Sequence, residues 1–383
     1  MSETMTDPYP LTDAPVAPAP GRLRSLDAFR GLTLAGMILV NNSGSGTKYA
    51  PLGHADWHGW TPTDLVFPFF VFIMGVSIAF ALARRLDSGA GLGKVLLKIV
   101  WRAVAIFGLG LLLNWFPFKE PFAELRIPGV LQRIAVCYLF AALIFLATGP
   151  RAQLALIFAL LVGYWAALTR IPVPGYELGD LSLEGNVAAY YDKLLLTPAH
   201  LYKATYDPEG ILSTLPALAT ALIGTLTGRW LRGPKSMGEK CAGMFVVATP
   251  LVIAGLAWNE VFPINKALWT GPFVLLTAGL ALHLLGIFYW VIDIQGWRKW
   301  ATPLVVFGVN PIAAYVLSGI GGQLLRMSPS PSGEGNLRQW IYSRGFESWL
   351  TPINASLGWA VAYVLFWLLV MTFFYRKNII IRL

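Results

Sequence analysis

Ten long apolar blocks follow one another along this chain, each close to the roughly 20 residues that a helix needs to cross a bilayer. They span 26–43, 62–83, 95–115, 128–148, 152–169, 211–231, 241–258, 269–292, 302–324 and 353–375. Only 13% of the 383 residues are charged, whereas soluble domains carry about 25%. The blocks also lack the alternating pattern of barrel strands. The sequence predicts an all-α integral membrane protein with about ten transmembrane helices and excludes a soluble enzyme.

The chain begins with a different kind of segment. Residues 1–20 are rich in Pro and Ala and contain acidic but no basic residues, unlike the start of a signal peptide. We expect a disordered cytoplasmic tail over 1–20 and one transmembrane domain over 21–383. Cys137 and Cys241 both lie inside apolar blocks, so we expect buried thiols rather than a disulfide framework or a thiol metal site.

The basic residues predict the orientation. The net charge is +9, and 18 of the 29 Lys and Arg fall on one side of the expected bundle, at the two ends of the chain and on or next to alternate connections. Basic residues collect on the cytoplasmic side of membrane helices. We therefore expect both termini to be cytoplasmic in a multi-pass protein of the inner (plasma) membrane, and no nucleic-acid partner. The long connections 44–61, 170–210 and 325–352 then face outward.

The densest polar cluster is the first outward connection, which contains His54 and His58. A histidine titrates near neutral pH and can take a proton from an attacking amine or hydroxyl. Two alternatives remain open, an idle loop histidine and a metal fragment formed with Asp56. A metal site needs a third ligand, and only the distant His200 is available outside, so we expect no metal.

Thr61-Pro62-Thr63-Asp64 opens the second block. Thr at the N-cap, Pro at the next position and an acid at the third helical position form a capping box. This explains Asp64 without any function. The alternative is that Asp64 also orients a histidine or pairs with an arginine.

Polar residues also enter the apolar blocks. Arg126 and Arg133 are seven residues apart, hence on one helix face and about 10 Å apart along its axis. Intramembrane arginines face protein or water and mark functional sites, so we expect Arg133 and the adjacent Gln132 to line a polar cavity. Asn310, before a proline, lines a cavity or bonds another helix. Residues 206–210 resemble a turn with an acidic N-cap.

Four segments in order resemble one family: RLRSLDAFRGL (22–32), HADWHGWTPTDLVFPFFVFIMG (54–75), RIPGVLQR (126–133) and YDPEGIL (206–212). The resemblance, to the membrane-embedded heparan-α-glucosaminide N-acetyltransferase family, runs from about residue 22 to 375. It implies a transmembrane acyltransferase that takes an acetyl group from cytosolic acetyl-CoA. The acceptor would be an amino sugar or glycan on the far side, with N- or O-acetylation left open.

The resemblance also assigns residues. His54 matches the family's catalytic histidine, and Asn41, Asp64 and Arg126 match further motif positions. His54 would act as general base or as acetyl carrier, with Asp64 holding its tautomer. Asn41 is a suitable oxyanion donor, which is worth about 3–4 kcal/mol, and Arg126 or Arg133 would add positive potential. The neighbouring cavity residues are Trp57 and His58.

The donor would bind at the opposite side. Four cations lie at the inner ends of the blocks and suit the phosphates of acetyl-CoA: Lys98, Arg102, Arg229 and Arg232. Positive-inside bias alone is the competing explanation. A transporter or channel for a sugar or acylated lipid is the rival function, but the blocks hold almost no intramembrane acids for ion coupling. A homodimer remains open.

Overall fold

The computed structural model describes residues 23–119 and 121–381. Within them the chain forms thirteen α-helices and no strand beyond one isolated bridge. The helices are α1 (Arg24–Asn41), α2 (Val66–Asp87), α3 (Leu92–Trp115), α4 (Val130–Ala147), α5 (Pro150–Arg170), α6 (Val187–Leu196), α7 (Thr214–Arg232), α8 (Met237–Trp258), α9 (Gly271–Phe288), α10 (Thr302–Val309), α11 (Pro311–Met327), α12 (Leu337–Tyr342) and α13 (Pro352–Arg376). The prediction of an all-helical membrane protein is confirmed. The expected tail over 1–20 lies outside the described residues.

Every expected block is helical, but fewer than ten are long and apolar enough to count as spans. Seven helices pass that test in the described part of the chain, or eight if α10 and α11 form one span. These two helices meet at a 75° bend, because Pro311 cannot continue the backbone ladder. Two further expected spans, α1 and α7, do not pass the test. α1 carries three charged residues and α7 carries four threonines, and both helices pack inside the bundle.

α2 and α7 are packed against each other through glycines at the centre of the bundle. A Cβ atom on Gly75 would lie 2.0 Å from the Ala221 carbonyl oxygen, and one on Gly224 would lie 2.2 Å from that of Phe72. Small residues let membrane helices approach closely enough for backbone contact. Cys137 and Cys241 are free and buried, as predicted.

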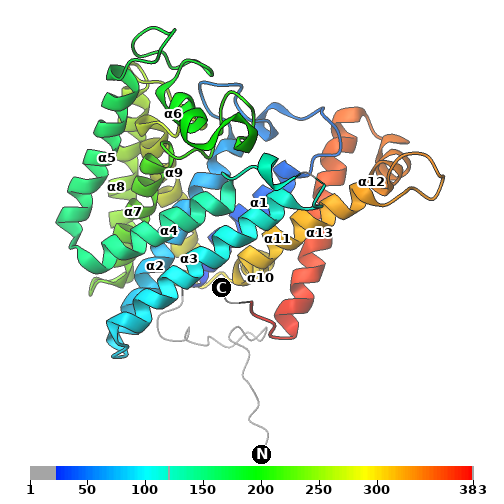
Figure 1. Ribbon diagram of the computed structural model, residues 1–383. Coiled ribbons are helices and arrows are strands. Elements are labelled where there is room, and N and C mark those ends of the chain that lie inside the picture. Colours follow the sequence, from blue (N-terminus) through cyan, green and yellow to red (C-terminus); the bar gives the residue numbers. More distant parts are fainter. Residues whose placement is uncertain (1–22, 120, 382–383) are drawn as a thin grey trace, which may run out of the picture.

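The bundle has two unlike ends (Figure 1). The long connections 42–65 and 171–213, with α6, and the segment containing α12 lie at one end, which we call the loop face. The short connections 88–91, 148–149 and 233–236 lie at the other end, the turn face. The C-terminal segment also lies at the turn face, where Asn310 holds it by bonds to Ile379 O (2.8 Å) and Ile381 N (2.9 Å).

Candidate active site

A histidine–aspartate pair lies at the loop face. His54 Nδ1 is 2.7 Å from Asp64 Oδ1, with the His54 side chain 51% exposed and that of Asp64 1% exposed. The predicted capping box is present: Asp64 Oδ2 accepts from the backbone N–H of Thr61 at 3.0 Å and of Ala55 at 3.1 Å. The carboxylate therefore serves both alternatives at once, since one oxygen fixes the loop and the other faces the imidazole.

Lys266, from the connection between α8 and α9, completes this cluster. Its Nζ lies 3.1 Å from Asp64 Oδ1 and 3.0 Å from His54 Nδ1. An ammonium only donates, so the close Nδ1–Oδ1 contact is satisfied when the imidazole N–H donates to Asp64. That tautomer leaves the Nε2 lone pair free. Burial lowers the pKa of Lys266, although the Asp64 carboxylate opposes the shift.

The loop that carries Lys266 is held from both sides. Asn265 Nδ2 donates to the Trp57 carbonyl at 2.9 Å, and Asn265 Oδ1 accepts from the Leu268 N–H at 2.8 Å. His58 Nδ1 lies 3.3 Å from the same Asn265 amide, and burial lowers the pKa of His58. Trp57 packs edge-on against Tyr206 with ring centroids 5.5 Å apart. Trp57 and His58 therefore both contact Asn265, the residue next to Lys266.

Arg126 forms a second charged cluster at the loop face. It bonds both oxygens of Asp207 (2.7 and 2.9 Å) and one oxygen of Glu209 (2.6 Å). Burial disfavours the charge, but these carboxylates outweigh it and raise the pKa of Arg126. Residues 206–210 do form a turn, in which Asp207 accepts from the Glu209 N–H. The expected acidic N-cap is wrong, because α7 begins only at Thr214 after Ser213.

Arg133 lies deeper, with 2% of the residue exposed. Its Nη2 donates to Ser213 Oγ at 2.5 Å and to the Gly210 carbonyl at 3.2 Å, and its guanidinium stacks 5.0 Å from the Trp269 ring centroid. Arg133 and Gln132 both line a cavity of about 370 Å³. That cavity is largely apolar rather than polar, because most of its other lining side chains are hydrocarbon.

Asn41 and Asn310 lie apart from the histidine. Asn41 ends α1 and lines a cavity of about 280 Å³ with Asn114 and Gln323. Within the described residues no hydrogen bond joins Asn41 to His54 or Asp64, so its oxyanion role remains a prediction. Asn310 uses its amide on the C-terminal segment at the turn face, as described above.

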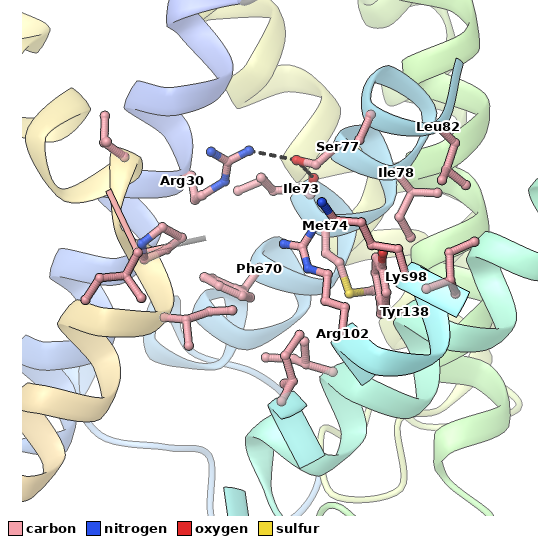
Figure 2. A pocket seen from close by; sticks show the side chains of 18 of the residues that line it. Arg30, Phe70, Ile73, Met74, Ser77, Ile78, Leu82, Lys98, Arg102 and Tyr138 are labelled. Carbon is pink, nitrogen blue, oxygen red and sulfur yellow. Dashed lines mark hydrogen bonds between the residues drawn. The ribbon is translucent and has the colours of Figure 1, made fainter. Parts of the chain in front are cut away.

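A cationic cavity of about 370 Å³ opens at the turn face. Figure 2 shows Arg30 from α1, Ser77 from α2, and Lys98 and Arg102 from α3 around the same space. Arg30 donates to Ser77 Oγ at 2.7 Å, and Arg102 stacks 5.0 Å from the centroid of the Tyr138 ring. The arrangement offers a multiply charged anion several donors between apolar walls.

The other two predicted donor-binding cations have different neighbours. Arg229 donates to the Phe145 (2.7 Å) and Thr148 (3.1 Å) carbonyls at the end of α4. Arg232 pairs with Asp87 at 2.8 Å. The structure therefore brings Lys98 and Arg102 together and places Arg229 and Arg232 at helix ends. No group of three or more metal-ligating side chains gathers in the described ranges.

Two residues were missed from the sequence. Lys266 lies on an outward connection, and a lysine against the positive-inside bias is itself a signal. Arg30 lies inside the apolar block 26–43, and the rule that singles out Arg133 as an intramembrane arginine applies to it as well. Lys266 lies 212 residues from His54, and Arg30 lies 47 residues from Ser77. Arg30 also pairs with Asp27, three residues away.

Comparison with known proteins reveals clear relatives. A family profile described as heparan-alpha-glucosaminide N-acetyltransferase, catalytic, matches residues 22–258. The protein named heparan-alpha-glucosaminide N-acetyltransferase from Homo sapiens is 33% identical over 377 residues, covering 82% of this chain and 56% of its own. The Mus musculus protein of that name is 34% identical over 350 residues, covering 77% and 53%. The chain thus spans about half the length of the curated relatives it matches.

Proposed function

The chain belongs to the heparan-alpha-glucosaminide N-acetyltransferase family, and we propose on that premise that it is a membrane-embedded acetyltransferase. It moves an acetyl group from cytosolic acetyl-CoA to the amine of a glucosaminide-type sugar on the extracytoplasmic side of the inner (plasma) membrane. The observation that carries this proposal is the His54–Asp64 pair at the loop face, with Nδ1 and Oδ1 2.7 Å apart. Its histidine occupies the position that the family motif assigns to catalysis.

The turn-face cavity fits the donor. Acetyl-CoA supplies an acetyl thioester at the end of a long arm and several phosphate charges at the other end. Lys98 and Arg102 present cationic donors, and Arg30 and Ser77 continue the polar lining inward. Charged hydrogen bonds of this kind are each worth about 1.5–3 kcal/mol. We therefore assign the phosphate end to Lys98 and Arg102.

The reach between the two faces supports transfer across the membrane. The cavity follows α2 from Arg85 to Phe70, about 22 Å at 1.5 Å per residue. From Phe70 to the level of Asp64 is about 9 Å more by the same rise. A thioester arm that enters at the turn face would thus need a short further path to meet His54.

At the loop face His54 acts as the base. Its Nε2 lone pair takes a proton from the acceptor amine while the new N–C bond forms and the thioester C–S bond breaks. The same Nε2–H then returns its proton to the departing CoA sulfur. Asp64 holds Nδ1–H in the required tautomer throughout, as the acid does in a hydrolase triad. Transient acetylation of His54 itself remains the alternative route.

Arg126 has a different role from the one its motif position implies. Asp207 and Glu209 compensate its charge, so it contributes little free positive potential. We propose that it fixes the 206–210 turn beside the site. Asn41 remains our candidate for an oxyanion donor.

The direct test uses purified protein in nanodiscs with radiolabelled acetyl-CoA and a panel of amino sugars. We expect label to transfer to a free-amine glucosaminide and not to its N-acetylated analogue. Absence of transfer to every amine tested would refute the proposal.

Sidedness has a separate test. Trp60→Cys, at the loop face, should react with a membrane-impermeant maleimide in intact cells, whereas Lys235→Cys, at the turn face, should not. Cys137 and Cys241 are buried, so background labelling is low. The reverse pattern would overturn both the orientation and the transmembrane transfer.

A further inference from the structure

A groove opens sideways from the bundle between α3, α4 and α7, and we call it the lateral groove. It is the cavity of about 370 Å³ that contains Arg133 and Gln132, and hydrocarbon side chains such as Phe107, Val136 and Leu218 line most of it. Phe140 is 48% exposed and Leu215 43% exposed at its rim. α3 and α4 are long and apolar enough to cross a membrane, so in a bilayer this opening faces lipid.

Two buried polar side chains in the groove have unsatisfied hydrogen-bond donors. Arg133 Nε and Nη1 and Gln132 Nε2 are buried and bond no described residue. Leaving a buried donor unpaired costs about 1–3 kcal/mol, and more for a charged group. A purely hydrocarbon occupant would leave that cost in place. An occupant that brings acceptor oxygens to this end of the groove would remove it.

The groove adjoins the histidine cluster through a short series of contacts. The Arg133 guanidinium stacks 5.0 Å from the centroid of the Trp269 ring, and the backbone N–H of Trp269 donates to the Lys266 carbonyl at 3.1 Å. The Lys266 ammonium in turn lies 3.0 Å from His54 Nδ1. Glu209, bonded to Arg126, also lines the groove. The polar end of the groove therefore lies beside the proposed catalytic site.

We propose that the acceptor is carried by the membrane: an amino sugar joined through a phosphate to a hydrocarbon chain. The chain lies in the lateral groove, and the phosphate oxygens accept from Arg133 and Gln132. The sugar amine then reaches His54. The inference rests on the proposed function and names its substrate class. The reaction is unchanged: the amine gains the acetyl group, and CoA leaves with the proton.

The first test compares two acceptors, methyl and dodecyl glucosaminide, with protein in nanodiscs. Each buried methylene is worth about fourfold in binding, so wild type should use the dodecyl compound at least about tenfold better in kcat/KM. Val136→Trp fills the groove and should bring this ratio towards one. Val246→Trp, on the lipid-exposed surface of α8, is the matched control and should keep the wild-type ratio.

The second test measures binding without turnover. Dodecyl phosphate should bind wild-type protein in native mass spectrometry and compete with the dodecyl acceptor, and Arg133→Gln and Val136→Trp should both weaken it. If both glucosaminides are acetylated with equal kcat/KM, the membrane-borne acceptor is refuted while the acetyltransferase stands. If neither is acetylated, the proposed function fails and this inference fails with it.

Discussion

The two candidate sites, one at each face of the bundle, handle charge in opposite ways. At the loop face, Lys266 and Arg126 each lie within 3.1 Å of a carboxylate oxygen, from Asp64 and Asp207 respectively. At the turn face, Lys98 and Arg102 form no ion pair with any carboxylate in the part of the chain that the structure describes. A compensated site suits proton transfer on an amine, whereas a cavity in which Lys98 and Arg102 lack a carboxylate partner suits a polyanion. Arg30, in the same cavity, is paired with Asp27 at 2.9 Å. The contrast therefore supports the proposed division into an acceptor face and a donor face.

The largest expected effect comes from removing the His54 side chain at the loop face. His54→Ala should lower kcat by about 10²–10⁴-fold, because it removes the proposed general base. Binding of acetyl-CoA, measured by the shift in melting temperature, should remain, since the proposed donor cavity is at the other face. His58→Ala is the matched control and should lose far less.

Two results would change this assignment. Near-normal turnover by His54→Ala would show that another group takes the proton. Loss of activity in His58→Ala, with His54→Ala still active, would assign the general base to His58 instead of His54. Labelled acetyl trapped on wild type but not on His54→Ala would favour the covalent route over direct transfer.

The next largest effect comes from removing a cation of the turn-face cavity. Arg102→Ala and Lys98→Ala should each raise the KM for acetyl-CoA about tenfold or more, because a charged hydrogen bond is worth about 1.5–3 kcal/mol. The change in kcat should be much smaller. Lys235→Ala, an exposed lysine of the same face, should leave KM unchanged. Equal effects from Lys235 would mean that only the general positive surface attracts the donor.

The sequence predicts the long helices and the local geometry around Asp64, but it does not predict the long-range contacts of the loop face or the short helices. Apolar block length predicts the helices, and the local capping pattern from Thr61 to Asp64 predicts how the second block begins. Lys266 is 212 residues from His54, and nothing local marks that contact. α6 and α12 form inside segments read as connections, where short helices depend on tertiary packing rather than on their own sequence.

A smaller effect concerns the charge balance of the loop face. Lys266→Met should lower kcat severalfold, because it removes the ammonium that lies 3.1 Å from Asp64 Oδ1 and 3.0 Å from His54 Nδ1. Lys266→Arg keeps the charge and should retain more of the activity. Equal activity of Lys266→Met and wild type would show that the ammonium serves only to hold its loop.

The smallest effect concerns Asp192 at the loop face. Unlike Asp64 and Asp207, Asp192 forms no ion pair within the described residues. Its Oδ1 accepts from the Ile211 N–H at 2.8 Å, and the missing Cβ of Gly210 lets the carboxylate pack there. Burial raises the pKa of Asp192 to about 6 from 3.8, although the Ile211 bond opposes this. A raised carboxyl pKa means that folding takes up a proton between about pH 4 and 6.

Thermal stability should therefore fall as pH rises through that window, by at most about 3 kcal/mol at 1.36 kcal/mol per pKa unit. Asp192→Asn keeps the acceptor oxygen but cannot ionise, so its melting temperature should lose this part of the pH dependence. Glu184→Gln, at an exposed position of the same connection, should keep it. If the slope between pH 4 and 6 is the same in Asp192→Asn and wild type, Asp192 is charged without penalty. The loop face would then hold a stable uncompensated charge, and the contrast between the two faces would no longer rest on charge pairing.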